Sequence, residues 1–122
     1  MSGPTNHISL QVQDQDGTAY TVRLAVAEPH ETGTLSILTP AGELAQQFEL
    51  THLQKGKDGT QLTCHISGAT VTLSLQHDNN SPQLHVAASW FFSIFDAVYR
   101  LDRAEHRRFS DWIKGLSIGG LA

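Results

Sequence analysis

The sequence predicts a mainly β protein: an up-and-down antiparallel meander of seven or eight strands, forming a small barrel or a strongly curved sheet, closed by one C-terminal α-helix. Three observations favour this fold class. Charged residues make up only 16% of the 122 residues, and Thr, Ser, Gln, His and Gly are common, which is typical of sheets with one solvent-facing side. Apolar and polar residues alternate between short turns over most of the chain. Helical spacing is sustained only near the C-terminus.

A hairpin is predicted at the start of the chain. Alternation runs through residues 7–13 and 19–27, and the loop 15–17 between them carries Gly17 at the position where a left-handed residue is favoured. This three-residue loop gives a register in which the apolar residues of the two strands face one another: Ile8 with Leu24, Leu10 with Val22, and Val12 with Tyr20.

Two further strands follow short turns. A turn at 29–32 leads into a strand that carries Leu35, which this spacing sets opposite Val26. The apolar residues of the segment 43–54 suit either a strand or a helix. Because its neighbours are strands, we predict a strand here, with a bulge near His52.

A second hairpin is predicted around the dipeptide 68–69, which suits a type II′ turn. This turn places the apolar residues of both strands on one face, with Ile66 opposite Val71, Cys64 opposite Leu73 and Leu62 opposite Leu75. A looser turn at 77–82 leads into a strand whose inward residues lie beside those of the previous strand: Leu84 beside Leu75, Val86 beside Leu73 and Ala88 beside Val71.

One helix is predicted at about 103–114, ended by Gly115. Asp102 is placed to cap its first turn, and Glu105 follows three residues later, as in a capping box. The small residues of 117–122 are expected to form a loose tail. An apolar stripe at helical spacing supports the helix and consists of Phe109, Trp112, Ile113 and Leu116.

Size, charge and cysteine content exclude several classes of protein. Residues 1–122 are expected to form a single domain. A net charge of −4 disfavours nonspecific binding to nucleic acid, so no nucleic-acid partner is expected. Cys64 is the only cysteine, which excludes an intramolecular disulfide and favours a cytoplasmic location. The longest apolar cluster, 90–95, is far shorter than the roughly 20 residues of a membrane-spanning helix, so no membrane span is expected.

The sequence predicts no metal site, no cofactor and no catalytic centre. None of its seven histidines is two or four positions from another, so local spacing offers no pair of metal ligands. His52 and Cys64 are expected to lie opposite each other on the inward face, where a thiolate–imidazolium pair would act as a nucleophile. No orienting third residue or oxyanion motif accompanies them. We therefore expect a protein that is not an enzyme.

Charged residues near the C-terminus are candidates for contact with a partner. Asp96 lies within an apolar segment, so its carboxylate must face solvent, pair with a residue such as Arg100, or line a cavity. Arg103 and Arg107 share one face of the predicted helix, where they are placed to meet an acidic partner or a phosphate. Carboxylates interleaved with these arginines favour instead a solvated face with helical ion pairs.

Surplus aromatic side chains are the main functional lead. The segment 91–101 suits either a buried strand or a helix, and its large side chains load both faces. We therefore predict a structural or interaction module that forms a homo-oligomer, or binds a protein partner, through 90–99 and the helix. The alternative is a small barrel that carries an apolar small molecule among Tyr20, Phe48, Leu62 and Trp90. Candidate interface or ligand residues are Trp90, Phe91, Phe92, Phe95, Asp96, Tyr99, Arg103, Arg107 and Trp112.

Overall fold

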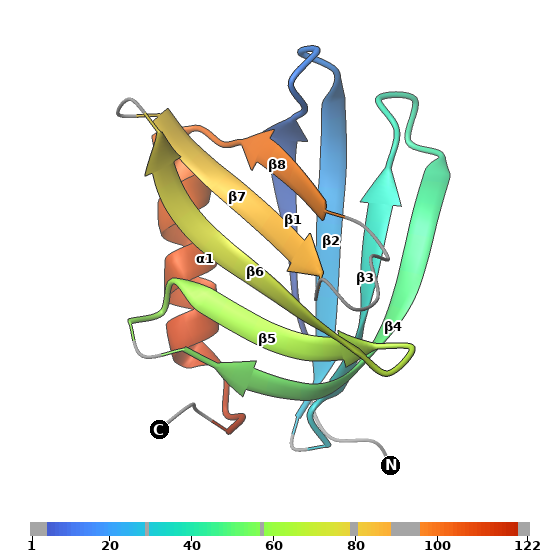
Figure 1. Cartoon of the computed structure of the whole chain (residues 1–122), viewed down its shortest axis with the longest axis vertical. Helices are drawn as coiled ribbons and strands as arrows, with labels where there is room; N and C mark the ends of the chain where they lie inside the picture. The colour runs from blue at the N-terminus through green and yellow to red at the C-terminus, as the bar shows by residue number, and fades with distance from the viewer. Residues whose placement is uncertain (1–4, 29, 57, 79–80, 89–95, 120–122) are drawn as a thin grey trace.

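A computed structural model describes residues 5–28, 30–56, 58–78, 81–88 and 96–119. These residues form eight antiparallel strands, hydrogen bonded in sequence order and closed into a barrel, with one C-terminal helix (Figure 1). The predicted fold class is confirmed, with eight strands and the barrel rather than an open sheet. The elements are β1 (Thr5–Gln13), β2 (Ala19–Ala27), β3 (Thr32–Leu38), β4 (Leu44–Lys55), β5 (Gln61–Ile66), β6 (Ala69–Asp78), β7 (Ser81–Ala88), β8 (Asp96–Arg100) and α1 (Arg103–Gly115).

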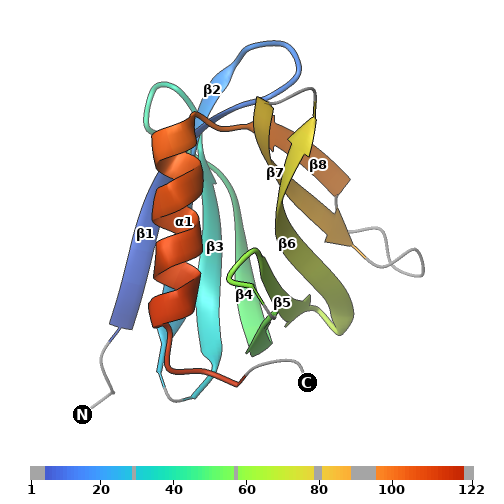
Figure 2. The ribbon, with the colours of Figure 1, turned by 90° about the vertical axis from the view of Figure 1, so that its left-hand side faces the viewer.

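The barrel closes over a very short stretch. β8 pairs with β7 along its whole length, from Asp96 to Arg100, but it pairs with β1 only between Arg100 and Gln13. α1 follows β8 in the chain, runs alongside β1 and contacts both β1 and β7 (Figure 2). The helix therefore covers the part of the barrel wall that β8 is too short to complete.

The interior is filled mainly by aliphatic side chains from β1 to β7, and many of them are leucines with no exposed surface. The apolar side of α1 joins this core, because Phe109 and Ile113 are both fully buried. Burying a helix stripe against the open side of a sheet is a common way to complete a small core. The helix is thus a structural part of the barrel rather than an appendage.

Two side chains of α1 satisfy the edge of β1 that β8 leaves unpaired. Glu105 is buried, and its carboxylate accepts a hydrogen bond of 2.7 Å from the backbone N–H of Gln11. Arg108 donates to the backbone carbonyl of Ser9 at 3.2 Å and also to the Glu105 carboxylate. Unpaired strand edges invite unwanted pairing with other chains. The Glu105–Arg108 pair replaces a neighbouring strand along this part of β1.

Several sequence predictions of register are confirmed. The first hairpin has the predicted pairs, including Val12 with Tyr20, and Gly17 has a φ of 83°. β6 and β7 are also paired as predicted. Of the segment 43–54, residues 44–54 belong to a strand, β4, whose register shifts between Thr51 and Gln54. His52 has a φ of 54° within that bulge.

The predicted register of the second hairpin is wrong by two residues. Ile66 pairs with Ala69, so the turn consists of Ser67 and Gly68, with φ values of 51° and 83°. Two positive φ values identify a type I′ turn rather than the predicted type II′. Consequently Cys64 pairs with Val71 and Leu62 with Leu73.

The predicted register between the second and third strands is also wrong by two residues. Leu35 pairs with Leu24 instead of Val26, because the chain reverses after Ala27 and Glu31 adopts a φ of 56°. The backbone N–H of Glu31 donates to the carbonyl of Ala27, which tightens this turn. A shift of two residues leaves every side chain on its predicted face, so the core is unaffected.

The helix begins as predicted and ends one residue later. The Asp102 side chain accepts a hydrogen bond of 2.8 Å from the backbone N–H of Glu105, which confirms the N-cap. α1 extends through Gly115, and its C-cap is Leu116 in an extended conformation. The Glu105 carboxylate is committed to the edge of β1. It therefore serves tertiary packing as well as standing at the capping-box position.

The expected loose tail is instead tied to the barrel as far as Gly119. The carboxylate of Glu28, which is buried, accepts a hydrogen bond from the backbone N–H of Ser117. Glu31 accepts from the N–H of Gly119 at 3.0 Å, and the N–H of Lys55 donates to the Gly119 carbonyl at 2.8 Å. Polar groups at one end of the barrel hold the segment that follows α1. Residues 120–122 lie outside the described residues.

Strand and helix were both predicted for the segment 91–101, and the structure decides between them for residues 96–100. Residues 96–100 form a strand, β8, whereas residues 91–95 lie outside the described part of the chain.

In the part of the chain that the structure describes, no helix has the length and apolar character needed to cross a membrane.

Candidate functional site

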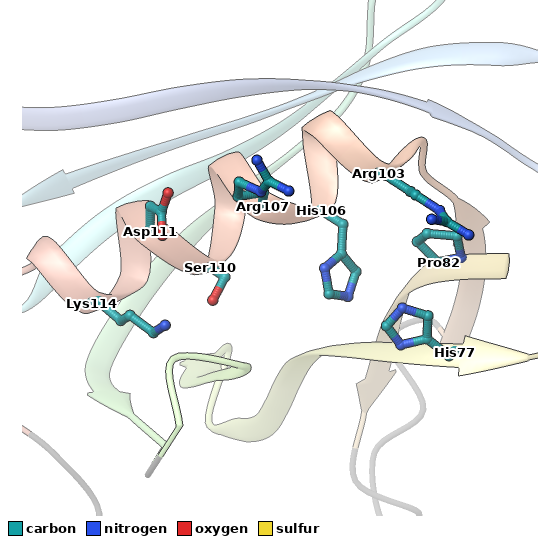
Figure 3. A pocket seen from close by; sticks show the side chains of 8 residues that line it. All are labelled: His77, Pro82, Arg103, His106, Arg107, Ser110, Asp111 and Lys114. Atoms are coloured by element: carbon teal, nitrogen blue, oxygen red, sulfur yellow. The ribbon is translucent and has the colours of Figure 1, made fainter. Parts of the chain in front are cut away.

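A cleft of about 530 Å³ lies between α1 and the adjoining parts of β6 and β7 (Figure 3). Six of its lining residues come from α1, at spacings of three and four, because such positions share one side of a helix. This stripe is separate from the buried stripe of Phe109 and Ile113. β6 and β7 supply the other wall. The lining residues are His77, Pro82, Arg103, His106, Arg107, Ser110, Asp111 and Lys114.

Three cationic side chains of this cleft have no partner in the described part of the chain. Arg103, Arg107 and Lys114 are exposed and make no hydrogen bond or ion pair there. Arg100 and Arg108, by contrast, are used within the fold, since Arg100 donates to Gln13 at 3.3 Å and Arg108 bonds to Glu105. The basic cluster that is visible in the sequence thus divides into structural arginines and arginines that face the cleft.

Two histidines from distant parts of the chain meet in the cleft. Figure 3 shows His106 pointing from α1 toward His77 of β6, and their ring centroids are 4.8 Å apart. The Nε2 atom of His106 is buried and has no hydrogen-bond partner among the described residues. Burial lowers the pKa of His106, and the neighbouring His77 lowers it further. His106 therefore resists protonation.

This lowered pKa predicts that stability decreases in mild acid. Between the lowered pKa of folded His106 and the ordinary value of 6.5, the unfolded chain binds more protons than the folded chain. With respect to His106, the free energy of unfolding should therefore be highest above about pH 6.5. It should decrease as the pH falls from there through the lowered pKa of the folded state. Urea unfolding at a series of pH values measures this dependence.

A matched pair of variants tests whether His106 causes that decrease. His106→Asn is expected to flatten the pH dependence of unfolding, because the titrating group is gone. His30→Asn is the control, since His30 is exposed and lies outside the cleft. An equally steep profile in both variants would rule out His106 as the source.

The two aromatic candidates that the structure describes, Tyr99 and Trp112, do not line this cleft. Trp112 is partly buried, packs against the core and stacks on Phe109 with ring centroids 6.0 Å apart. Tyr99 is buried and meets Tyr20 edge-on at 6.5 Å, and burial is the main cause that raises the pKa of Tyr99. The remaining aromatic candidates, Trp90, Phe91, Phe92 and Phe95, lie outside the described residues.

Asp96 faces solvent, which is one of the three predicted environments, and its partner is a residue other than Arg100. Its carboxylate is exposed and lies 3.2 Å from Nε2 of His85 on the adjacent strand, rather than beside Arg100. Asp96 pairs with Ala87 and Val98 pairs with His85, so Asp96 and His85 are diagonal neighbours on the outer face of β7 and β8. Strand pairing, which single-strand patterns do not reveal, decides this contact.

The expected juxtaposition of His52 and Cys64 is wrong. The bulge in β4 turns His52 outward, and Leu53 takes the inward position with no exposed surface. Cys64 is fully buried, and burial raises the pKa of its thiol to about 12. A buried thiol with a raised pKa is a core side chain rather than a nucleophile.

Metal-ligating side chains are paired but not clustered. Within the described ranges, no three His, Cys, Asp or Glu side chains lie together in a way that would hold a metal ion. Two histidine pairs are present, His77 with His106 and His52 with His65. Both pairs join residues from different elements, so local spacing in the sequence did not predict them. The predicted bulge near His52 was the one local feature of the sequence that bears on the position of either pair.

Comparisons with models of protein families, with curated proteins and with solved structures find no match to this chain.

Proposed function

We propose that this protein is a non-enzymatic interaction module that binds an acidic segment of a partner protein in the α1 cleft. The observation that carries the proposal is the group of unpaired cations Arg103, Arg107 and Lys114 along one face of the helix. Arginine side chains present several donors in a fixed fork that matches a carboxylate. A segment with carboxylates at intervals would find Arg103 and Arg107 one helical turn apart and Lys114 about two turns further along α1.

The charge of the whole chain makes this local cluster notable. The chain carries 12 acidic and 8 basic residues, so its long-range field does not attract anions. Three of the basic residues nevertheless share one cleft, where Asp111 is the single carboxylate among the lining residues. Short-range complementarity therefore favours an acidic partner at this site over nucleic acid, which binds extended basic surfaces.

Buried side chains support a binding role over a catalytic one. The only cysteine is buried, and burial raises the pKa of its thiol to about 12. Within the described residues, neither His77 nor His106 makes a hydrogen bond to a carboxylate that would orient it as a general base.

A labelled hexaglutamate peptide is the probe for this proposal. Fluorescence anisotropy should show salt-sensitive binding to the native chain. We expect Arg103→Gln combined with Arg107→Gln to weaken it at least about tenfold, because two charge-assisted contacts are lost. Arg23→Gln is the matched control, since Arg23 is exposed on β2 and does not line the cleft. Equal binding by the double variant and the control would overturn the proposal.

Self-association through 90–99 and α1 stays a prediction, and light scattering of the same variants separates it from the proposal. A native chain that is oligomeric, with a double variant that is monomeric, would identify the acidic partner as a second copy of this chain. An oligomer unaffected by the double variant would place self-association outside the cleft.

A carrier of apolar ligands is the second candidate, and the closed barrel is the observation that favours it. Of its predicted lining residues, Leu62 is fully buried in the core and Tyr20 and Phe48 are packed against that core. The described interior is also occupied by Phe109 from α1. This filling supports the interaction module over the carrier.

A further inference from the structure

Two imidazole rings lie side by side on the outer surface of β4 and β5. His52 is exposed, His65 is partly buried, and their ring centroids are 4.6 Å apart with a tilt of 33° between the planes. Neither residue lines the α1 cleft. The pair exists because of the bulge in β4: Thr51 pairs with His65 and Gln54 with Thr63, so β4 has one extra residue here, and His52 is exposed on the outer surface.

We propose that His52 and His65 form a two-imidazole site for a divalent transition-metal ion of the Cu²⁺, Ni²⁺ and Zn²⁺ group. Imidazole nitrogens bind such ions at about 2.0–2.1 Å. Two rings held on one ion at an angle of about 90° to 110° have centroids about 4.5–5.2 Å apart, from the same bond lengths. The spacing of 4.6 Å therefore suits joint coordination. Water or an exogenous ligand would occupy the remaining positions.

A neighbouring hydroxyl is placed to orient one of the ligands. Nδ1 of His52 lies 3.0 Å from Oγ1 of Thr51. When Nδ1 carries the proton and donates it to that oxygen, the lone pair of Nε2 is free for a metal ion. Histidine ligands are commonly held in this way by a hydrogen bond from their other ring nitrogen.

Backbone conformation gives a second indication that His52 is specifically positioned. Its φ of 54° lies in the left-handed region, which residues other than glycine seldom adopt. A bulge in an antiparallel strand commonly redirects a side chain in this way. The bulge that imposes this conformation is also what brings the His52 ring to His65.

The charge of the surroundings distinguishes this pair from the other histidine pair. His77 and His106 have a similar centroid distance of 4.8 Å, but they share a cleft with Arg103, Arg107 and Lys114. These cations oppose the entry of a metal cation. Among the described residues, no charged side chain makes a hydrogen bond or ion pair with His52 or His65. Metal binding is therefore assigned to the β4–β5 pair alone.

Substoichiometric Cu²⁺ added to protein without a histidine tag provides a direct test. Paramagnetic Cu²⁺ broadens the NMR signals of nearby ring protons, and the seven histidines give an internal comparison. We expect the His52 and His65 signals to disappear first and together, while those of His77 and His106 persist. Simultaneous broadening of all seven, or preferential broadening at another histidine, would contradict the proposal.

Ligand variants test whether both rings are needed. His52→Asn keeps a residue that tolerates positive φ, and His65→Thr keeps a residue suited to a strand. Calorimetric titration with Ni²⁺ should show one ion per native chain and at least about a tenfold loss of affinity in either variant. His77→Asn is the control and should bind as the native chain does. Circular dichroism verifies the fold, and full binding by either folded ligand variant would overturn the proposal.

Discussion

Replacement of Phe109 by alanine is expected to lower the free energy of unfolding by about 3–5 kcal/mol. Phe109 has no exposed surface, lies in the main core and stacks on Trp112. It belongs to α1, which packs against β1 and β7. Removing the ring leaves a cavity between the helix and the sheet. The two cannot easily close around it, because hydrogen bonds made by Glu105 and Arg108 hold α1 in place on β1.

Chemical unfolding measured by circular dichroism checks this prediction. Arg107→Ala is the matched control, because Arg107 is on the same helix but exposed. We expect the control to change stability by less than about 0.5 kcal/mol. A loss below about 1 kcal/mol for Phe109→Ala would mean that α1 is not an integral part of the core.

Replacement of Glu105 by alanine is expected to cost about 2–3 kcal/mol of unfolding free energy. Its buried carboxylate accepts from the backbone of Gln11 and from Arg108. Alanine is favourable in a helix, so the loss reflects the unpaired N–H of β1 and the released arginine rather than helix propensity. Hydrogen bonds to charged groups are stronger than neutral ones, which accounts for the expected size of the effect.

A double-mutant cycle with Arg108→Ala separates the two contacts of Glu105. The Arg108 side chain is 53% exposed, so its removal alone should cost less than about 1 kcal/mol. The contact with Gln11 should account for the larger share of the Glu105→Ala effect. If both single variants lose the same stability, the carboxylate does not protect the β1 edge as described.

Local patterns in the sequence were sufficient to predict the order of strands, the inward faces and the start of the helix. The period of two in a strand assigns each side chain to a face without any knowledge of its neighbour. Asp102 acts within one turn of helix, and Gly17 acts within one hairpin, so both signals can be read locally. These predictions depend on interactions over a few residues.

Strand registers were less predictable, for a reason contained in the same period. A shift of two residues between neighbouring strands keeps every apolar side chain inward, so patterning cannot distinguish the alternatives. The conformation of the turn decides instead. Ser67 and Gly68 both adopt positive φ, and Glu31 does so before β3. Non-glycine residues in this conformation carry only a weak sequence signal.

The candidate sites were only partly predictable. The sequence indicated that Arg103 and Arg107 share a helix face, because helical spacing is local. It did not indicate that Arg108 is used at the β1 edge, or that His77 and His106 meet, since these contacts join residues far apart in the chain.

By itself, the sequence determined a β meander with a defined inside and a capped C-terminal helix. Only the tertiary structure decided the closure at Gln13 and Arg100, the anchoring of the segment after α1, and the two histidine pairs. The physical reason is range. Alternation, turns and caps are interactions between near neighbours in the chain, whereas closure and site assembly depend on which distant elements the folded core brings together.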